Sequence, residues 1–342
     1  MRILLVMDPF IPVPPAHYGG IERVIYDIAC QYVKLGHRVT IVAGPNSKSP
    51  DRLITYGLNG SLDPSINIKL LTTVFFILRK EIKQHDVIHN FGRLLFLFPF
   101  LKHKIPKVQT YMRTVNRKNI EWLDKLRPVN LTYTAVSNAI TNTGKTNKSK
   151  WVTIYNCAPI EQFKFKATVS PKGYLAFLGR IERCKGLHNA IKVAQLTNSK
   201  LVIAGNISAI EKERIYFEQE IMPLIDGDQI SYIGEVDNAQ KNELLGNAIA
   251  LLTPVEWFEP FPIIIPEAYA CGTPVLGFDD GGIAEGIDEN ITGYISQNTE
   301  EMAQQVKKIS QLDRYACRLK AETTYSDVKI ADDYLSVYRS NL

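Results

Sequence analysis

The feature of this sequence that most constrains its fold is a set of short apolar runs that are almost uninterrupted and that alternate with helix-like segments. Residues 3–7 and 39–43 form two such runs, and residues 21–35 between them have helical periodicity. A strand of a parallel sheet is covered by helices on both faces, so polar residues do not occupy every second position. The pattern of apolar runs in the N-terminal part of the chain therefore predicts parallel α/β structure.

The same alternation starts again in the second half of the chain. Further apolar runs lie at residues 174–178, 201–204, 249–252 and 274–277. Helix-like segments separate them, as expected for a second parallel sheet. The pattern thus predicts two doubly wound sheets in tandem.

A length of 342 residues also exceeds what one hydrophobic core usually serves. We expect an N-terminal domain at residues 1–155 and a C-terminal domain at residues 156–324. Residues 325–342 read as an amphipathic helix that packs back on the first domain. The fold class predicted is therefore α/β, with two Rossmann-like domains facing each other across a deep cleft.

The charge of the chain is unevenly distributed. Residues 1–160 hold 22 Lys and Arg against 9 Asp and Glu, whereas residues 161–342 hold 18 against 26. A basic surface attracts an anionic membrane, a phosphate-bearing acceptor or nucleic acid, because all three present the same long-range field. We expect an anionic acceptor or membrane surface as the partner of the basic half and no nucleic acid.

The cysteines and the first apolar run bear on the cellular compartment. Five cysteines are scattered without the spacing of a metal site or a disulfide framework. The run at residues 3–7 is too short for the apolar segment of a secretory signal. We expect a cytoplasmic protein, peripheral at the inner face of the membrane if its basic half binds there.

The segment from Glu259 to Val275 is the richest in chemical groups, and it follows an apolar run. Pro260 and Pro262 keep Glu259 in a loop, and Pro262 suits the opening of a helix over residues 263–271. The free N–H groups of residues 263–265 would then attract phosphate. Glu259 and Glu267 could accept hydrogen bonds from ligand hydroxyls, the latter from a ribose diol.

This segment resembles the E-x7-E signature of family 4 glycosyltransferases, which are retaining enzymes of the GT-B fold. Upstream, Gly179-Arg180 and Lys185-Gly186 resemble the family's "GR…KG" element. The resemblance implies that Arg180 and Lys185 hold the donor diphosphate and that Glu259 contacts the donor sugar. Two cations suit a group that leaves with added negative charge.

Other positions resemble the family less specifically. Gly19 and Gly20 resemble the glycine loop of its N-terminal domain, and they also read as a simple turn. His89 matches the first position of a catalytic H-x-H element, but Phe91 stands at the second position, and a core histidine is an equal alternative. Pro262 has no N–H with which to contact the donor. The resemblance therefore implies donor contacts at Phe261, Ile263 and Ile264.

The sequence leaves open the roles of two segments in the N-terminal half, one basic and one apolar. Arg113 and Arg117 could meet an acceptor phosphate or belong to a solvated loop. Residues 94–101 are apolar and are followed by lysines, which suits either a buried helix or a surface that touches a membrane. Only exposure to solvent distinguishes these alternatives.

The predicted function is that of a retaining, metal-independent glycosyltransferase. It would move a sugar from a nucleoside diphosphate sugar to a glycan, a lipid-linked acceptor or a small molecule, and it would need no cofactor. No Asp-x-Asp metal motif stands in a suitable loop. Two alternatives stay open, a sugar-nucleotide epimerase of the same fold and a non-catalytic nucleotide-sugar binding module.

Overall fold

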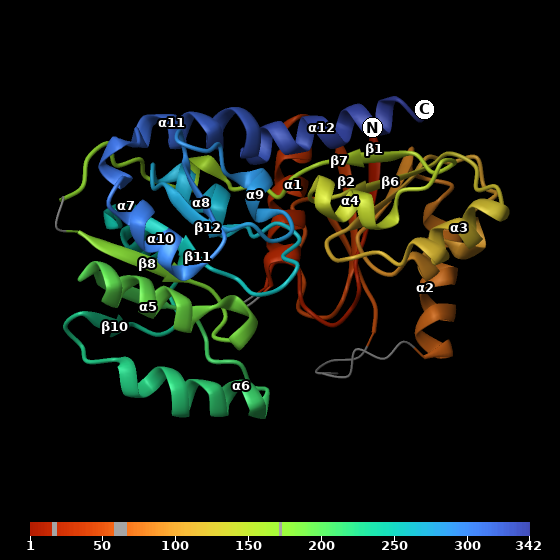
Figure 1. Cartoon of the computed structure of the whole chain (residues 1–342). Helices are drawn as coiled ribbons and strands as arrows, with labels where there is room; N and C mark the ends of the chain where they lie inside the picture. Colours follow the sequence, from red (N-terminus) through yellow and green to blue (C-terminus); the bar gives the residue numbers. More distant parts are fainter. Residues whose placement is uncertain (16–18, 58–66, 171–172) are drawn as a thin grey trace. The chain divides into compact units, whose positions relative to one another are not determined.

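The computed structural model describes residues 1–15, 19–57, 67–170 and 173–342. The described chain forms two compact units (Figure 1). Unit 1 comprises Met1–Asn156 and Asp327–Leu342, and unit 2 comprises Cys157–Ser326. Each unit has its own parallel sheet, so the prediction of two parallel α/β domains is confirmed.

In the described part of unit 1, the sheet has seven strands in the order β3-β2-β1-β4-β5-β6-β7, all paired in parallel. They are β1 (Arg2–Val6), β2 (Arg38–Ala43), β3 (Arg52–Thr55), β4 (Val87–Asn90), β5 (Lys107–Tyr111), β6 (Leu131–Ala135) and β7 (Trp151–Thr153). The chain leaves β1 toward β2 on one side and later returns to β4 on the other side. The order of strands therefore reverses between β1 and β4.

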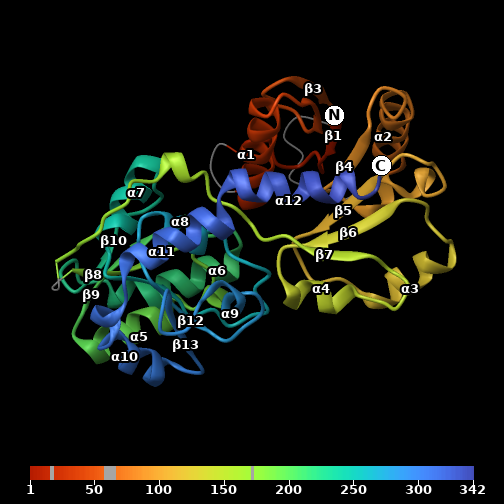
Figure 2. The ribbon, with the colours of Figure 1, turned by 90° about the horizontal axis from the view of Figure 1, so that it is seen from above.

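Helices cover the sheet of unit 1, and the last of them comes from the C-terminus. They are α1 (Gly20–Lys34), α2 (Ile68–Glu81), α3 (Arg117–Lys125), α4 (Asn138–Gly144) and α12 (Asp327–Arg339). Helix α12 lies against α1 (Figure 2). Gln31 Nε2 donates to Asp327 Oδ2 at 2.5 Å, and the buried hydroxyls of Tyr32 and Tyr338 are 3.0 Å apart. These bonds attach the C-terminal helix to α1 of unit 1.

The sheet of unit 2 has six parallel strands in the order β10-β9-β8-β11-β12-β13. They are β8 (Tyr174–Leu178), β9 (Lys200–Ala204), β10 (Ile230–Tyr232), β11 (Ala250–Thr253), β12 (Val275–Phe278) and β13 (Gly293–Ser296). The order reverses between β8 and β11, as it does between β1 and β4 in unit 1. The two sheets thus share one topological feature, a switch point between two neighbouring strands.

Seven α-helices accompany the described strands of unit 2. They are α5 (Leu187–Thr197), α6 (Glu211–Tyr216), α7 (Asn238–Asn247), α8 (Ile264–Ala270), α9 (Ile283–Gly286), α10 (Thr299–Val306) and α11 (Arg314–Lys320). Helix α10 packs on α5, whereas α7 and α11 both contact α8. The apolar core of the unit includes fully buried Leu175, Ile191 and Leu252.

The structure corrects one expectation about residues 94–101. They form two short 3₁₀ turns, Leu94–Phe96 and Phe98–Phe100, and no continuous helix. Phe96 and Phe100 are buried, while Leu95 and Phe98 face solvent. Pro99 within the run explains the break, because it supplies no N–H for a helix in its interior. Among the described helices, none combines the length and the apolar character needed to cross a membrane.

Candidate functional site

The first candidate site lies where the strand order of unit 2 reverses. Neighbouring parallel strands β8 and β11 end at the same edge of the sheet, and their connections then run to opposite sides. Ligands of open α/β sheets bind beyond the carboxyl ends of strands at such a point. Arg180 and Lys185 follow β8, and Glu259 follows β11.

A glycine lets these two loops approach each other. Gly186 has φ +72°, and a Cβ there would lie 1.7 Å from the carbonyl oxygen of Pro254. Next to it, the N–H of Glu256 donates to the carbonyl of Cys184 at 2.8 Å. Any other residue at position 186 would meet both backbone strain and a direct clash. The position of Lys185 beside the loop after β11 therefore depends on Gly186.

Lys185 and Glu259 are in direct contact. Lys185 Nζ donates to Glu259 Oε2 at 2.6 Å, and Trp257 Nε1 donates to the same oxygen at 2.6 Å. The Lys185 ammonium also lies 4.8 Å from the centroid of the Trp257 ring. Glu259 is buried and the Lys185 side chain is half-buried, so water screens the ion pair less than it would at the surface. The structure thus brings together two of the residues predicted from the sequence.

The loop after β12 holds the backbone of Glu259. The N–H of Gly282 donates to the Glu259 carbonyl at 2.7 Å. Gly281 has φ +59°, and a Cβ there would lie 2.1 Å from that same carbonyl oxygen. Three consecutive strand ends, those of β8, β11 and β12, therefore position one carboxylate.

Arg180 has a different partner, which is on its own loop. Its Nε lies 2.9 Å from Glu182 Oε1, and Ser208 Oγ donates to that oxygen at 3.1 Å. Glu182 is buried, whereas the Arg180 side chain is about one third exposed (31 %). Glu182 thus anchors the guanidinium at the strand end, and part of the guanidinium stays in contact with solvent.

Glu267 lies in a second buried ion pair. It belongs to α8, and its Oε1 accepts a hydrogen bond from Lys241 Nζ of α7. Both side chains are nearly inaccessible, and the Lys241 ammonium also lies 5.4 Å from the Phe163 ring. In the described residues, Glu267 is linked to Lys241 and not to the pair formed by Lys185 and Glu259. Whether it meets a ribose stays a prediction.

The start of α8 differs from the sequence expectation. The helix begins at Ile264, and the N–H of Ile265 already donates to the carbonyl of Pro262 at 3.2 Å. Only Ile263 and Ile264 of the expected three remain as donors toward a phosphate. The ring of Phe261 is buried against Tyr325, with 5.5 Å between the centroids, so its side chain packs in the core, and a donor contact of Phe261 stays a prediction.

His89 is the predicted site residue that the structure places least favourably. It is fully buried in β4, and both ring nitrogens are engaged, Nδ1 with the Tyr338 hydroxyl at 2.5 Å and Nε2 with Thr110 Oγ1 at 2.6 Å. Burial holds the pKa of the imidazole well below its usual value, so the ring is neutral. With no nitrogen left for a substrate, a catalytic role does not fit, and His89 is a core histidine that ties α12 to the sheet.

The glycine pair of unit 1 begins helix α1. Gly20 is the first helical residue, and Gly19 before it has φ +148°. A Cβ on Gly19 would lie 2.7 Å from Pro15, so a larger residue does not fit. Glu22, in the first turn, is buried, and burial, reinforced by Asp8, raises the pKa of its carboxyl to about 7. Tyr18, which precedes this glycine pair, lies outside the described residues.

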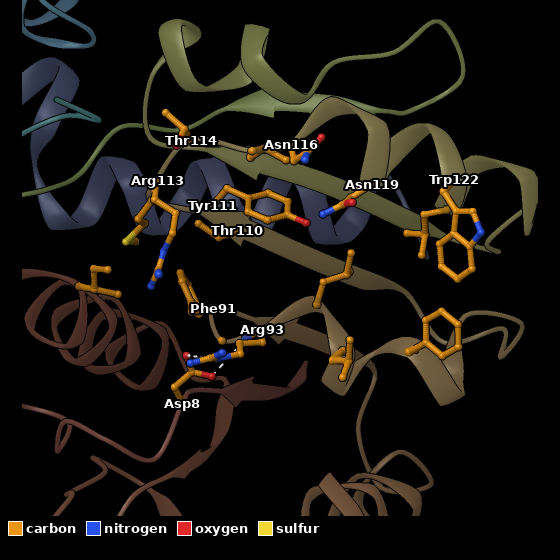
Figure 3. A pocket seen from close by; sticks show the side chains of 18 of the residues that line it. Asp8, Phe91, Arg93, Thr110, Tyr111, Arg113, Thr114, Asn116, Asn119 and Trp122 are labelled. Carbon is orange, nitrogen blue, oxygen red and sulfur yellow. Dashed lines mark hydrogen bonds and ion pairs between the residues drawn. The ribbon is translucent and has the colours of Figure 1, made fainter. Parts of the chain in front are cut away.

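Unit 1 has a pocket of about 1100 Å³ beside its own switch point (Figure 3). Its lining includes Asp8 after β1, Phe91 and Arg93 after β4, and Arg113 after β5. Asp8 Oδ1 accepts the N–H of Arg93 at 3.2 Å, and Arg93 Nε lies 3.8 Å from Asp8 Oδ2. The other end of the pocket is apolar and includes Trp122.

Sequence reasoning missed the residues that hold the predicted ones in place. Glu182, Trp257 and Lys241 contact Arg180, Glu259 and Glu267 respectively. A local signal existed for Glu182, which stands two residues after Arg180, and for Trp257, which stands two residues before Glu259, but not for Lys241. Within the described ranges, no group of three or more His, Cys, Asp or Glu residues is placed to hold a metal ion. The edge of unit 2 offers two cations and a buried carboxylate, a set suited to a phosphorylated sugar.

Two family models match the chain, one in each half. "Glycosyltransferase Family 4" matches residues 18–162, and "Glycosyl transferases group 1" matches residues 160–323. Among curated proteins, spore coat protein SA of Bacillus subtilis is 21 % identical, and the match covers 100 % of both chains. The gpi3 subunit of the phosphatidylinositol N-acetylglucosaminyltransferase of Schizosaccharomyces pombe is 22 % identical over 97 % of this chain and 78 % of its own.

A comparison with solved structures agrees on the fold. The Anabaena protein HepE, solved in complex with UDP-glucose, superposes with a TM-score of 0.75 at 18 % identity and covers 99 % of this chain and 100 % of its own. At that identity the likeness concerns the fold alone. The two models together span nearly the whole chain, and its two parallel sheets agree with the superposition. The chain therefore belongs to the family 4 glycosyltransferases and has the GT-B fold.

Proposed function

We propose that this glycosyltransferase uses a nucleoside diphosphate sugar as its donor, retains the anomeric configuration and needs no metal ion. The donor would bind at the carboxyl edge of unit 2. The single observation that carries the proposal is the contact of Lys185 with Glu259 at the switch point, with Arg180 on the same loop as Lys185. The cations match the diphosphate of such a donor. The carboxylate, which accepts hydrogen bonds from hydroxyls, matches its sugar.

Each charged residue has a distinct part in the proposed reaction. The diphosphate gains negative charge as its bond to the sugar breaks. Fixed cations lower the barrier of this step because they bind the diphosphate more strongly in the transition state than in the ground state. Arg180 and Lys185 would supply this stabilisation in place of a metal ion. Glu259, whose Oε2 is held by Lys185 and Trp257, would accept hydrogen bonds from sugar hydroxyls.

We propose that the anomeric configuration is retained because the acceptor hydroxyl attacks the same face of the sugar from which the diphosphate leaves. A phosphate oxygen of the donor would take the proton of the attacking hydroxyl. A double displacement needs a carboxylate nucleophile at the anomeric carbon. Glu259 does not fit that role, because its Oε2 accepts hydrogen bonds from Lys185 and Trp257, which lowers its nucleophilicity.

The choice of first donors to test follows from the structural relatives. The HepE protein binds UDP-glucose and shares the fold, which favours uridine nucleotide sugars. GDP- and ADP-sugars form the comparison set. Acceptors are tested after a donor has been found, because the donor alone gives a binding signal.

The experiment is a thermal-shift screen of the full chain with UDP-, GDP- and ADP-sugars. A donor at one hundred times its dissociation constant stabilises the folded state by about 2.7 kcal/mol. Arg180→Ala and Lys185→Ala should lose this shift, whereas Lys192→Ala should keep it, because Lys192 pairs with exposed Glu300 elsewhere in unit 2. If both site variants respond like the parent, the proposed donor site is wrong.

Product analysis then separates the proposed reaction from its alternatives. Transfer should release nucleoside diphosphate in proportion to the acceptor consumed, and the proton NMR coupling of the new anomeric centre should match that of the donor. Activity should persist in the presence of EDTA. Conversion of the donor into an isomer of equal mass without acceptor would indicate an epimerase, and donor binding without turnover of any acceptor would indicate a binding module.

A further inference from the structure

One end of the unit 1 pocket is made of apolar side chains. They come from α2, from the two 3₁₀ turns after β4 and from α3, and they are Leu71, Leu94, Leu95, Phe98, Trp122 and Leu123. The rings of Phe98 and Trp122 are stacked, with centroids 5.8 Å apart and planes 5° apart. Figure 3 shows Trp122 at the far side of the pocket from Arg113.

The stacked pair does not serve the core of unit 1. On α3, Ile120 and Leu123 are the buried residues, whereas Trp122 is 52 % exposed. Phe98 is 41 % exposed between buried Phe96 and Phe100. Exposed apolar surface that is gathered in a pocket marks a place where a ligand removes it from water.

The opposite end of the pocket is lined by two arginines and one carboxylate, and the charge of Arg113 acts on Asp8 and on buried Glu22. Asp8 is already balanced by Arg93 through an ion pair and a backbone hydrogen bond. Arg113 is exposed and forms no hydrogen bond or ion pair with the described part of the chain, and in Figure 3 its guanidinium points toward Phe91 and Asp8. An anionic ligand group would give the Arg113 guanidinium a direct hydrogen-bond partner.

We propose that this pocket binds an acceptor that has both a phosphate group and a hydrocarbon group. The phosphate lies at Arg113, and the hydrocarbon covers Phe98 and Trp122. The volume of about 1100 Å³ accommodates both parts. A plain saccharide is a poorer match, because its hydroxyls would lose hydrogen bonds to water against the apolar end. This inference rests on the proposed function, since it names the acceptor of that reaction.

The test is calorimetric titration of the full chain with hexyl, octyl and decyl phosphate below their micelle concentrations. Inorganic phosphate and octyl glucoside serve as the single-feature probes. Each methylene buried in the pocket should tighten binding roughly fourfold. Inorganic phosphate and octyl glucoside should each bind at least about tenfold more weakly than octyl phosphate, because each lacks one of the two contacts.

Matched variants separate the two ends of the pocket. Trp122→Ala should flatten the dependence on chain length, and Trp122→Phe should restore most of it. Arg113→Ala should weaken every alkyl phosphate by about tenfold and keep the dependence on chain length. Phe76→Ala and Lys118→Ala are the controls, because both residues are exposed and neither lines the pocket. Both controls should bind like the parent.

Several outcomes would overturn the inference. Affinity independent of chain length would remove the hydrocarbon contact, and equal binding of octyl glucoside would remove the phosphate contact. Recruitment to vesicles of anionic phospholipid without binding of single alkyl phosphates would indicate a membrane-contact surface instead. The donor-induced thermal shift is measured on the same samples. A normal donor-induced shift together with no binding of alkyl phosphates would overturn this inference and retain the proposed function. Binding of alkyl phosphates without a donor-induced shift would overturn the proposed function and retain the pocket as a binding site.

Discussion

The two switch points of this protein have the same topology and different chemistry. In unit 2, the loops after β8 and β11 place Lys185 on buried Glu259. In unit 1, the equivalent edge holds a wide pocket with an exposed aromatic pair, and the histidine of its β4 strand is sunk in the core. The comparison teaches that strand order decides where a ligand can bind, whereas the loops decide which ligand it is.

The largest effect is expected from removing a cation of unit 2. Lys185→Ala should lower kcat/KM for sugar transfer by 10²- to 10³-fold, about 3–4 kcal/mol, because the leaving diphosphate loses a fixed positive charge. Steady-state kinetics with the donor found in the thermal-shift screen measures this. Lys192→Ala, in the same unit, should change kcat/KM less than twofold. A loss below tenfold for Lys185→Ala would place the diphosphate elsewhere.

The second prediction concerns a buried carboxyl of unit 1. Burial, followed by the charge of Asp8, raises the pKa of Glu22 to about 7, so the folded state binds more protons than the unfolded state between about pH 4.5 and 7. The free energy of unfolding should therefore fall as the pH rises through this window, by roughly 3 kcal/mol in total. Urea unfolding at pH 5 and pH 8 measures it.

Glu22→Gln should lack this loss of stability, because the amide does not titrate. Glu121→Gln, at an exposed position of the same unit, should behave like the parent. Equal pH dependence of the parent and Glu22→Gln would show that the carboxyl of Glu22 is solvated.

His89 gives the sharpest contrast between the two units. His89→Ala should lower the free energy of unfolding by about 2–3 kcal/mol, because Thr110 and Tyr338 each lose a buried hydrogen-bond partner. At a temperature where the variant is folded, kcat should stay within about threefold of the parent. A general acid or base would instead cost 10²- to 10⁴-fold without loss of stability, and that result would restore the catalytic role predicted from the sequence.

The smallest effect is expected from the indole of unit 2. Trp257→Phe removes the hydrogen bond to Glu259 Oε2 and keeps an aromatic ring beside Lys185. We expect the KM for the donor to rise about fivefold, near 1 kcal/mol, with little change in kcat. Trp257→Ala, which also removes the ring, should cost more. Equal values for the two variants would mean that the N–H contributes nothing.

The sequence predicted the strands that lie in the middle of both sheets. Uninterrupted apolar runs mark β1, β2, β8 and β11 because both faces of these strands are covered. The outer strands β3, β7 and β13 were missed, since they are short and only partly apolar. Residues 94–101 were expected as one helix or as a surface, and the structure contains both buried and exposed members of this run.

The candidate site was predictable only as far as its motifs. Arg180, Lys185 and Glu259 could be named because spacing and residue type carry over from the family. The partner Lys241 could not, because it reaches Glu267 from another helix, α7. Trp257 could not, because a separation of two residues in a loop does not show where the indole points. For His89 the sequence left a catalytic and a core histidine as equal alternatives, because the burial that favours the core histidine is not visible in the sequence.

The sequence by itself determined the two parallel sheets and the residues that follow their central strands, because the period of apolar residues is a local property. Tertiary structure alone decided which charges are in contact, which histidine is neutral and buried, and which aromatic residues stay exposed. These properties depend on neighbours that come from distant positions in the sequence, as with Lys185 and Glu259. The energy of a charge or of an aromatic ring depends on these neighbours.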